Sequence, residues 1–320
     1  MHLITGGAGF ISVELTGRLL ASGQSVLCLD NLSRGRIELL EPFREHKRFA
    51  FAQADCADYD AFLQAVESQH AAEPITDVWH LAANSDIPAG VADPTVDLKD
   101  TFMTTFTLLR VMKTLGIPNC RFASSSAIYG DLGQQSIFED IGPLQPISNY
   151  GAMKLASEVQ IRAAVEAFLP RADIFRFPNV IGVPATHGVI LDFVRRLKDD
   201  PSCLVVLGNG TQKKPYLHVG ELVDAMLYIA RTANGAYNVF NIGPDDDGVT
   251  VRFIAETVRD RVAQGGQIAY GEEARGWVGD VPRFAYSSAR LRDLGWAPKF
   301  NSAEAIRTAV DEIARQEGFG

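Results

Sequence analysis

Short apolar runs recur along the first half of the chain, and each has the length of a buried β-strand. Stretches with apolar residues at helical spacing separate them. The runs are His2–Thr5, Ser25–Asp30, Phe49–Asp55, Asp77–Ala83, Cys120–Ser126 and Ala172–Val180. Strands that alternate with helices in this way predict a parallel sheet with helices on both of its faces.

Two of the intervening stretches carry an apolar stripe that fits one face of a helix. The stripes are Phe10, Ile11, Leu15, Leu19 and Leu20, and then Leu98, Phe102, Phe106, Leu109 and Met112. Residues three and four positions apart lie on the same face of a helix, so each stripe can pack against the sheet. We therefore expect helices that begin near Phe10 and near Leu98.

The second half of the chain has a different pattern. Apolar runs at Leu204–Leu207, Tyr216–Val219 and Tyr237–Ile242 are separated by turns rich in Gly, Asn and Asp, and helical patterns occur near 190–198, 220–232, 250–263 and 302–315. Thr250 is the expected N-cap of the third of these helices. The sequence predicts a first domain over residues 1–179 and a smaller α+β domain over 180–320, with a soft boundary across which segments can interleave.

Composition and charge exclude several classes of protein. The 320 residues are 47% hydrophobic and 22% charged, which is ordinary for a globular chain. No apolar run approaches the ~18 residues of a membrane span, so we expect no membrane partner. The net charge of −9, without a block of Lys or Arg, argues against a nucleic-acid partner.

The cysteines and the amino terminus bear on the compartment. Cys28, Cys56, Cys120 and Cys203 form no C-x-x-C pair, so neither a metal site nor thioredoxin-type chemistry is predicted. We expect buried, reduced thiols. The first residues lead directly into glycines with no basic segment and no long apolar stretch, so we expect a cytoplasmic protein.

A glycine-rich loop follows the first predicted strand and opens the first predicted helix. In Thr5-Gly6-Gly7-Ala8-Gly9-Phe10-Ile11-Ser12, Gly6 permits a tight turn and Gly9 permits backbone to approach a pyrophosphate. The helix N-terminus adds N–H donors and the positive end of its dipole. In this strand–turn–helix context the loop predicts dinucleotide binding; a bare structural turn is the alternative.

An acidic residue ends the second predicted strand, roughly 20 residues past the loop. Asp30 can accept hydrogen bonds from the adenine ribose and would repel a 2′-phosphate, which favours NAD over NADP. Asn31 and Ser33 continue this ribose edge, although Arg34 and Arg36 could in principle meet a phosphate. Asp55, after the third strand, could accept from the adenine amino group or could simply be a solvated strand end.

A serine-rich strand end and a Y-x-x-x-K motif supply the candidate chemistry. Tyr150 and Lys154 stand four residues apart, so on a helix they share a face. An ammonium beside a phenol is expected to lower the phenol's pKa from about 10 towards neutrality, and such a tyrosine can take or give a proton near pH 7. The hydroxyls of Ser124, Ser125 and Ser126 end an apolar strand, at the edge where open α/β sheets bind ligands.

The order and spacing of these motifs resemble the extended short-chain dehydrogenase/reductases, and among them the nucleotide-sugar epimerases and dehydratases. The resemblance covers nearly the whole chain. Its marks are TGGAGFI at 5–11, Asp30-Asn31, HLAA at 80–83, SSSAIYG at 124–130, YGAMK at 150–154, Arg176, Asn179-Val180, GNGTQKKPYLHV at 208–219, NIG at 241–243 and LGWAP at 294–298. It implies an α/β fold: a Rossmann-type doubly wound parallel sheet with a smaller C-terminal α+β substrate domain.

The same resemblance implies a set of site residues. It makes Ser125, Tyr150 and Lys154 catalytic, with Tyr150 as the base. It implies that NAD contacts Gly6, Gly9, Phe10, Ile11, Asp30, Asn31, Ser33, Asp55, Cys56, Leu81, Ala82, Ala83, Tyr150 and Lys154. It implies substrate contacts at Ser125, Ser126, Asn179, Lys214, Tyr216, Arg275 and Asp280. It also suggests a homodimer that pairs through the helices near 98–115 and 149–165.

Three departures from the family pattern stand out. Ser12 replaces the third glycine of the loop, and Thr101 stands where the family often has Asn. Lys214 lies near the position of an arginine that often clamps the diphosphate, and a lysine supplies charge without bidentate geometry. Arg275, ahead of Gly279-Asp280, is the remaining candidate clamp.

The residues after the catalytic serine favour one reaction of the family. In the family that the chain resembles, dehydratases have Thr-Asp-Glu at this place and decarboxylases commonly have a Glu, whereas this chain has Ser126-Ala127 and no carboxylate. The prediction is therefore NAD-dependent epimerisation of a nucleotide-diphosphate sugar, at C4 of a UDP-hexose. A dehydratase or decarboxylase, a net reductase and a catalytically silent NAD-sensing protein remain the alternatives.

Overall fold

The structure, a computed structural model, describes residues 1–133, 135–273 and 285–320. The chain packs into two compact units whose segments interleave. Unit 1 comprises Met1–Ile128, Leu144–Arg176 and Met226–Phe240, and unit 2 comprises Tyr129–Pro143, Phe177–Ala225 and Asn241–Gly320. The predicted division into domains at residues 1–179 and 180–320 stays a prediction. Among the described residues, no helix is long and apolar enough to cross a membrane.

Unit 1 is built on a sheet that we call the main sheet. Within the described residues it has seven strands in the order β12-β7-β5-β4-β1-β2-β3. Their bounds are β1 His2–Thr5, β2 Val26–Asp30, β3 Phe49–Gln53, β4 Asp77–His80, β5 Asn119–Ala123, β7 Arg171–Arg176 and β12 Tyr237–Asn241. β1 pairs in parallel with β2 on one side and with β4 on the other, so the strand order reverses at β1. The predicted α/β class with a Rossmann-type sheet is confirmed.

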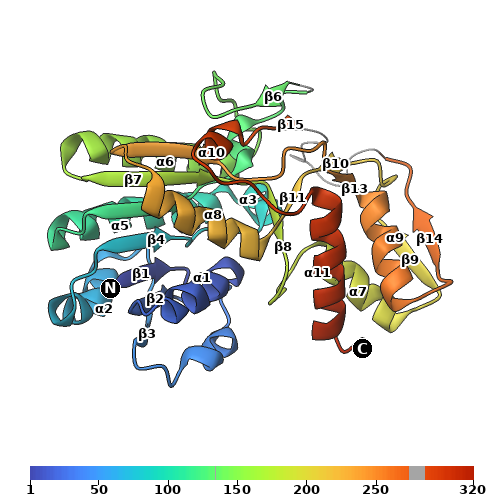
Figure 1. The fold of residues 1–320 in the computed structure, drawn as a ribbon, viewed down its shortest axis with the longest axis horizontal. Coiled ribbons are helices and arrows are strands. Elements are labelled where there is room, and N and C mark those ends of the chain that lie inside the picture. Colours follow the sequence, from blue (N-terminus) through green and yellow to red (C-terminus); the bar gives the residue numbers. More distant parts are fainter. Residues whose placement is uncertain (134, 274–284) are drawn as a thin grey trace. The chain divides into compact units, whose positions relative to one another are not determined.

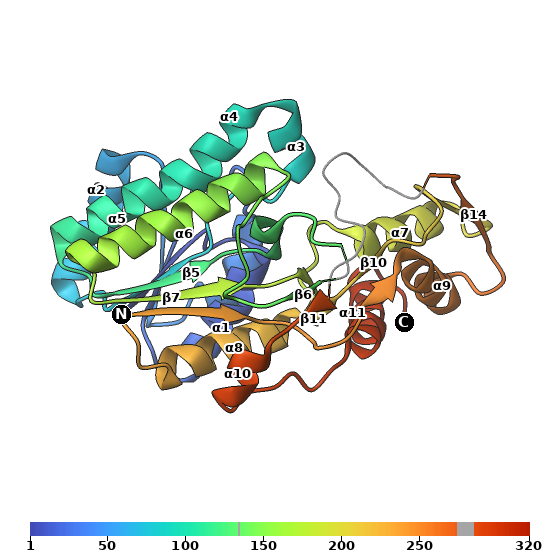
Figure 2. The same ribbon diagram turned by 90° about the horizontal axis from the view of Figure 1, so that it is seen from above.

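Helices cover both faces of the main sheet (Figures 1 and 2). α2, α5 and α6 lie on one face, and α1 lies on the other with the part of α8 from Met226 onward. The helices have these bounds: α1 Phe10–Ala21, η1 Ile37–Phe43, α2 Tyr59–Ala72, α3 Ile87–Ala92, α4 Pro94–Asp97, η2 Leu98–Met103, α5 Thr104–Leu115, η3 Ser126–Tyr129, α6 Asn149–Ala167 and α8 Val219–Thr232. A core of buried side chains, among them Phe62, Leu108 and Ile174, fills the space between sheet and helices.

The helix predicted to begin near Leu98 is divided in two. Residues Leu98–Met103 form the π-helix η2, and α5 follows from Thr104 to Leu115. The hydroxyls of Thr104 and Thr105 both donate to the carbonyl of Thr101, at 2.9 and 3.3 Å. Side-chain hydroxyls that compete for a helix carbonyl favour this kind of local widening, and π-turns are frequent at functional sites.

Unit 2 consists of small sheets and helices. Its elements are β6 Ser136–Ile137, β8 Asn179–Ile181, α7 Val189–Asp199, β9 Cys203–Val206, β10 Lys213–Lys214, β11 Tyr216–His218, β13 Val249–Thr250, α9 Val251–Val262, β14 Gln267–Tyr270, β15 Ala285–Tyr286, α10 Ala289–Asp293 and α11 Ser302–Gln316. α7, α9 and α11 bury Val194, Ile254 and Val310 in one core. The predicted N-cap is confirmed, because the Thr250 hydroxyl accepts from the N–H of Phe253 at 3.1 Å.

Two strand predictions need correction. The run Ala172–Val180 was expected as one strand, but β7 ends at Arg176 and β8 begins at Asn179 in a different sheet. Pro178 has no N–H to donate and separates them. The run at Tyr237–Ile242 was expected among the strands of the smaller domain, but it forms β12, which extends the main sheet.

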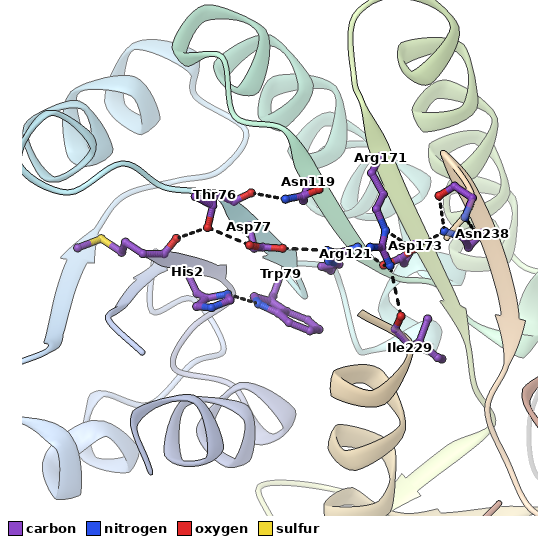
Figure 3. A network of polar contacts seen from close by, with 12 residues as sticks. His2, Thr76, Asp77, Trp79, Asn119, Arg121, Arg171, Asp173, Ile229 and Asn238 are labelled. Atoms are coloured by element: carbon purple, nitrogen blue, oxygen red, sulfur yellow. Dashed lines mark hydrogen bonds and ion pairs between the residues drawn. The ribbon is translucent and has the colours of Figure 1, made fainter. Parts of the chain in front are cut away.

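A polar network spans the amino edge of the main sheet (Figure 3). Arg121 lies between Asp77, whose Oδ1 it contacts at 2.9 Å, and Asp173. Asp173 also accepts from Arg171 at 3.0 Å and from Asn238 at 2.7 Å. The side chains of Arg121 and Asp173 are 4% and 0% exposed, so each charge depends on the other for compensation.

We expect Asp173→Ala to destabilise the protein by about 3–5 kcal/mol, because it leaves a buried guanidinium with one carboxylate in place of two. Asp260→Ala is the matched control: Asp260 is 67% exposed and pairs with Arg259, so its loss should cost ~1 kcal/mol or less. Urea unfolding followed by circular dichroism measures both. Equal losses in the two variants would contradict the importance of the buried network.

Candidate active site

The glycine loop between β1 and α1 lies against neighbouring strand ends. Gly6 has φ +67°, and a Cβ there would stand 2.8 Å from the amide nitrogen of Ala82. A Cβ on Gly7 would stand 2.5 Å from the Cβ of Cys28. The loop can therefore pass this close to β2 and to the segment after β4 only with glycine at both positions.

Ser12, the first departure from the family pattern, has a function of its own in the loop. Its hydroxyl donates to the carbonyl of Gly6 at 2.6 Å, and its side chain is buried. The serine therefore ties the first turn of α1 to the turn that precedes it. Gly9 is the N-cap of α1 and has no side chain that could cap the helix. The first N–H groups of the helix can therefore donate to a bound anion.

Asp30 ends β2 and holds the loop from the other side. One carboxylate oxygen accepts from the N–H of Ala8 at 3.0 Å, and the other accepts from the N–H of Leu32 at 2.8 Å. Each carboxylate oxygen has a further lone pair, so Asp30 can still accept from a ribose hydroxyl. Arg34 pairs with Asp86 at 3.0 Å, which compensates its charge.

The other residues predicted to contact the cofactor lie at the same edge of the main sheet. They follow the carboxyl ends of β1, β2, β3 and β4, as Phe10 and Ile11, Asn31 and Ser33, Asp55 and Cys56, and Leu81, Ala82 and Ala83. Asp55 accepts from the N–H of Ala57 at 2.9 Å and lies 3.3 Å from the ammonium of Lys99. The glycine turn, the uncapped start of α1 and the carboxylate of Asp30 fit a dinucleotide with a free ribose 2′-hydroxyl.

The start of α6 brings Tyr150 to the end of β5. Ser148 is the N-cap, and its hydroxyl accepts from the N–H of Gly151 at 3.1 Å. A Cβ on Gly151 would lie 2.5 Å from the carbonyl oxygen of Ala127, so this first turn packs directly on the segment after β5. Ser125 lies within that segment, close enough to Tyr150 that its side chain lowers the pKa of the phenol. The structure therefore brings the two predicted catalytic hydroxyls together.

Lys154 is buried beneath this pair. Its ammonium donates to the carbonyl of Ala123 at 2.6 Å and lies over the ring of Phe122, 4.7 Å from the ring centre. The centre of the Tyr150 ring is 5.8 Å away. Tyr150 and Lys154 share one side of α6, as their spacing predicted.

The predicted lowering of the Tyr150 pKa is wrong for this structure. Loss of water around the hydroxyl raises the pKa of Tyr150 to about 12, while the hydrogen bond with Ser125 lowers it. Burial also lowers the pKa of Lys154 to about 7, although the charges of Glu158 and Asp97 raise it. An amine with that pKa is only partly charged at neutral pH, which weakens the effect on which the prediction relied.

Several polar residues at this edge carried no role in the sequence prediction. Asn84 donates to Asp97 Oδ1 at 2.9 Å, and its N–H donates to the hydroxyl of Thr101 at 3.2 Å, so the threonine at the second departure is part of a buried cluster. Glu158 pairs with Arg176 at 2.6 Å and accepts from the hydroxyl of Ser124. The four-residue spacing of 150, 154 and 158 was a visible signal for Glu158.

The residues predicted to bind substrate are divided between the two units. Ser126 begins η3 in unit 1, next to Ser125. In unit 2, Asn179 of β8 stands opposite Tyr216 of β11, and Lys214 pairs with Val249 across β10 and β13. Asn179 is exposed, and Tyr216 is buried. Arg275 and Asp280 lie outside the described residues.

A family model agrees with this geometry. The model of the NAD dependent epimerase/dehydratase family matches residues 2–243. The chain belongs to this family. It is an enzyme of the family, and its cofactor is NAD.

Related proteins extend the match over the whole chain. UDP-glucose 4-epimerase of Lacticaseibacillus casei is 30% identical over 339 residues, which cover 99% of this chain and 98% of that protein. The crystal structure of Thermus thermophilus UDP-glucose 4-epimerase in complex with NAD has a TM-score of 0.83 at 28% identity and covers 98% of each chain. That of Thermotoga maritima UDP-glucose 4-epimerase with UDP-glucose has a TM-score of 0.85 at 25% identity and covers 99% of each chain.

We expect this NAD-dependent enzyme to bind NAD on the order of 100-fold more tightly than NADP, because Asp30 would face the 2′-phosphate and like charges brought together cost several kcal/mol. Isothermal titration of the stripped protein with both cofactors measures the ratio. Asp30→Asn should reduce the ratio to less than ~10-fold as that repulsion is lost. Asp55→Asn should leave the ratio unchanged, because the adenine is common to both cofactors. Equal affinity in the wild type would mean that Arg34 or Arg36 overrides the carboxylate.

Proposed function

We propose that this enzyme interconverts the C4 epimers of a UDP-hexose. The observation that carries the proposal is that Ser125 and Tyr150 come together at the carboxyl end of β5, where Ser125 lowers the pKa of the Tyr150 phenol, with Lys154 on the next turn of α6. The names of the relatives support the same substrate class, since the Lacticaseibacillus, Thermus and Thermotoga proteins are UDP-glucose 4-epimerases.

The chain's own residues divide the work as follows. Bound NAD supplies the hydride acceptor and donor, so that C4 passes through a ketone and can be reduced on either face. Tyr150 takes the proton of the C4 hydroxyl as the hydride leaves and gives it back when the hydride returns. Ser125 donates its single hydroxyl proton to the C4 oxygen, and its oxygen accepts a hydrogen bond from Tyr150 once the phenol is protonated. Lys154 supplies positive charge beside both hydroxyls.

The surroundings of this pair favour epimerisation over elimination or decarboxylation. Ser126 and Ala127, the residues after Ser125, carry no carboxylate. The carboxylates of Asp97 and Glu158 are buried at 0% and 2% exposure and accept hydrogen bonds from Asn84 and Arg176. Carboxylates held in this way do not reach a sugar as an acid–base pair for loss of water.

We assign the nucleotide diphosphate to unit 2. Asn179, Lys214 and Tyr216 are the proposed contacts, together with Arg275 and Asp280 from outside the described residues. Lys214 gives the diphosphate a point charge rather than a bidentate clamp. A pocket that grips the nucleotide and leaves the sugar free to turn allows the ketone to present either face. The expected cytoplasmic location stays a prediction.

Incubation with UDP-glucose that carries deuterium at C4 tests the reaction. The epimer should form with the label still at C4, because the hydride returns to the carbon that it left, and proton NMR reads the product. Tyr150→Phe is the control variant: turnover should fall by about 10²–10⁴ while NAD stays bound. A 4-keto-6-deoxy sugar, release of carbon dioxide, or free NADH in stoichiometric amount would each contradict the proposal. Absence of turnover with a panel of UDP-, GDP- and CDP-sugars would favour a silent NAD-binding protein.

We also propose that the enzyme is a homodimer that pairs through η2, α5 and α6. α5 and α6 lie side by side on the outer face of unit 1 (Figure 2). Each of the three elements exposes a large apolar side chain: Leu98 at 48%, Phe106 at 37% and Val159 at 62%. Apolar side chains on adjacent elements are typical of a surface covered by a second copy.

Light scattering at micromolar concentration should give the mass of two chains for the wild type. Val159→Lys should give one chain, because the new charge would be buried at the interface. Val205→Lys is the matched control, since Val205 is 55% exposed on β9 in unit 2 and lies outside the proposed surface. A monomeric wild type, or a dimer that survives Val159→Lys unchanged, would refute the pairing.

A further inference from the structure

A carboxylate stands one turn beyond the catalytic lysine on α6. Tyr150, Lys154 and Glu158 follow one another at intervals of four residues, so their side chains form one stripe along the helix. Glu158 is 2% exposed and Arg176, at the end of β7, is 6% exposed. Glu and Arg are almost never fully buried unless they are paired, and these two residues pair with each other.

Two side chains bind the Glu158 carboxylate, and a third binds the backbone of the same residue. Arg176 donates through Nε to Oε1 at 3.0 Å and through Nη2 to Oε2 at 2.6 Å, which is a bidentate pair. Ser124, directly after β5, donates its hydroxyl to Oε1. The hydroxyl of Tyr237 on β12 donates to the backbone carbonyl of Glu158 at 3.4 Å. The carboxylate is thereby held at the carboxyl ends of β5 and β7.

Lys154 is anchored to the residue next to Ser124. Its ammonium donates to the carbonyl of Ala123 at 2.6 Å, and its side chain is 2% exposed. A buried ammonium loses its hydration and is stable only if nearby charge compensates it. Adjacent residues at the end of β5 therefore hold the amine and the carboxylate in register.

The other titratable groups around Lys154 supply less compensation. His80 on β4 is buried with its Nδ1 2.6 Å from the Thr5 hydroxyl, and burial lowers the pKa of His80 to about 3, so it is neutral. Asp97 on α4 also faces Lys154, but burial raises the pKa of its own carboxyl. Glu158 makes the largest contribution that raises the pKa of Lys154.

We propose that Glu158 is a positioning residue for the epimerisation proposed above, which favours the charged form of Lys154 within the buried site while Arg176 and Ser124 hold the carboxylate in place. It acts through Lys154 and touches neither sugar nor cofactor. The expected effect on turnover rests on the proposed function. The expected effect on the charge of Lys154 rests only on the contacts of Glu158.

The charge on Lys154 can be measured directly by NMR. In NAD-loaded protein with ¹³C-labelled lysine, the ε-methylene signal that disappears in Lys154→Met reports the titration. Glu158→Gln should lower the pKa of Lys154 by about 1–3 units, the usual effect of an opposite charge on a neighbouring group. Glu158→Asp should recover most of that shift, because it keeps the charge. Ser124→Ala keeps the charge of the carboxylate and its bidentate pair with Arg176, so it should change the pKa of Lys154 by much less than Glu158→Gln does.

Arg176→Met tests whether the Glu158–Arg176 pair has an electrostatic or a purely structural role. This variant can be measured even if Glu158→Gln does not fold. Removal of the guanidinium leaves the carboxylate uncompensated, so the pKa of Lys154 should rise, opposite to the effect of Glu158→Gln. A purely structural pair would leave the lysine titration unmoved or disturb it in the same direction in both variants. Either result would overturn the proposal.

The pH profile of turnover gives the second measurement. Lys154 is charged below its pKa and neutral above it, so activity that needs the ammonium is lost as the pH rises. In Glu158→Gln the alkaline limb of kcat should move to lower pH by the shift seen in the NMR titration, with KM unchanged. The NMR titration needs no sugar. The expected titration without turnover of any nucleotide sugar would therefore reject the proposed function and keep this inference. Turnover of a nucleotide sugar, together with an unchanged pKa of Lys154 in Glu158→Gln, would support the proposed function and reject this inference.

Discussion

Parallel pairing of β1, β2, β4, β5 and β7 places the carboxyl ends of these strands at one edge of the main sheet. The glycine loop, Asp30, the segment at 124–127 and Arg176 all follow such strand ends, although more than 100 residues separate the first from the last. One helix completes the arrangement. α6 starts against the end of β5 because Gly151 lets its first turn touch the carbonyl of Ala127.

A buried arginine pairs with a carboxylate at both the amino and the carboxyl edge of this sheet, but the two pairs have different surroundings. At the amino edge Arg121 is buried between Asp77 and Asp173, far along the strands from the glycine loop, and the three charges compensate one another. At the carboxyl edge Arg176 pairs with Glu158, and that carboxylate continues into the stripe of Lys154 and Tyr150. A buried ion pair contributes little net stability, so its position beside titrating groups is the more informative property.

Desolvation dominates the electrostatics around Tyr150 and Lys154, the proposed catalytic residues. The same burial that raises the pKa of Tyr150 to about 12 lowers that of Lys154 to about 7, so both groups are driven towards their neutral forms. Hydrogen bonds and fixed charges oppose this: Ser125 on the phenol, and Glu158 and Asp97 on the amine. Proton transfer at neutral pH depends on those opposing interactions more than on the spacing of tyrosine and lysine.

Local patterns in the chain were sufficient for the strands, the main helices and the motifs of the site. Buried parallel strands are short apolar runs, and the glycine loop and Y-x-x-x-K are contiguous, so both can be recognised without knowledge of the fold. The break at Pro178, the π-helix at 98–103 and the place of β12 in the main sheet could not be recognised, because each depends on which distant segment the backbone meets.

By itself the sequence determined the order of the elements and the family to which the chain belongs, and it predicted which residues carry the chemistry. Only the tertiary structure decided how those residues behave. It showed that Ser12 bonds to Gly6, that Lys154 donates to the carbonyl of Ala123, and that Glu158 lies between Arg176 and Ser124. The reason is physical. Protonation and hydrogen bonding depend on burial and on neighbours from other strands, and neither is encoded in the spacing of residues along one helix.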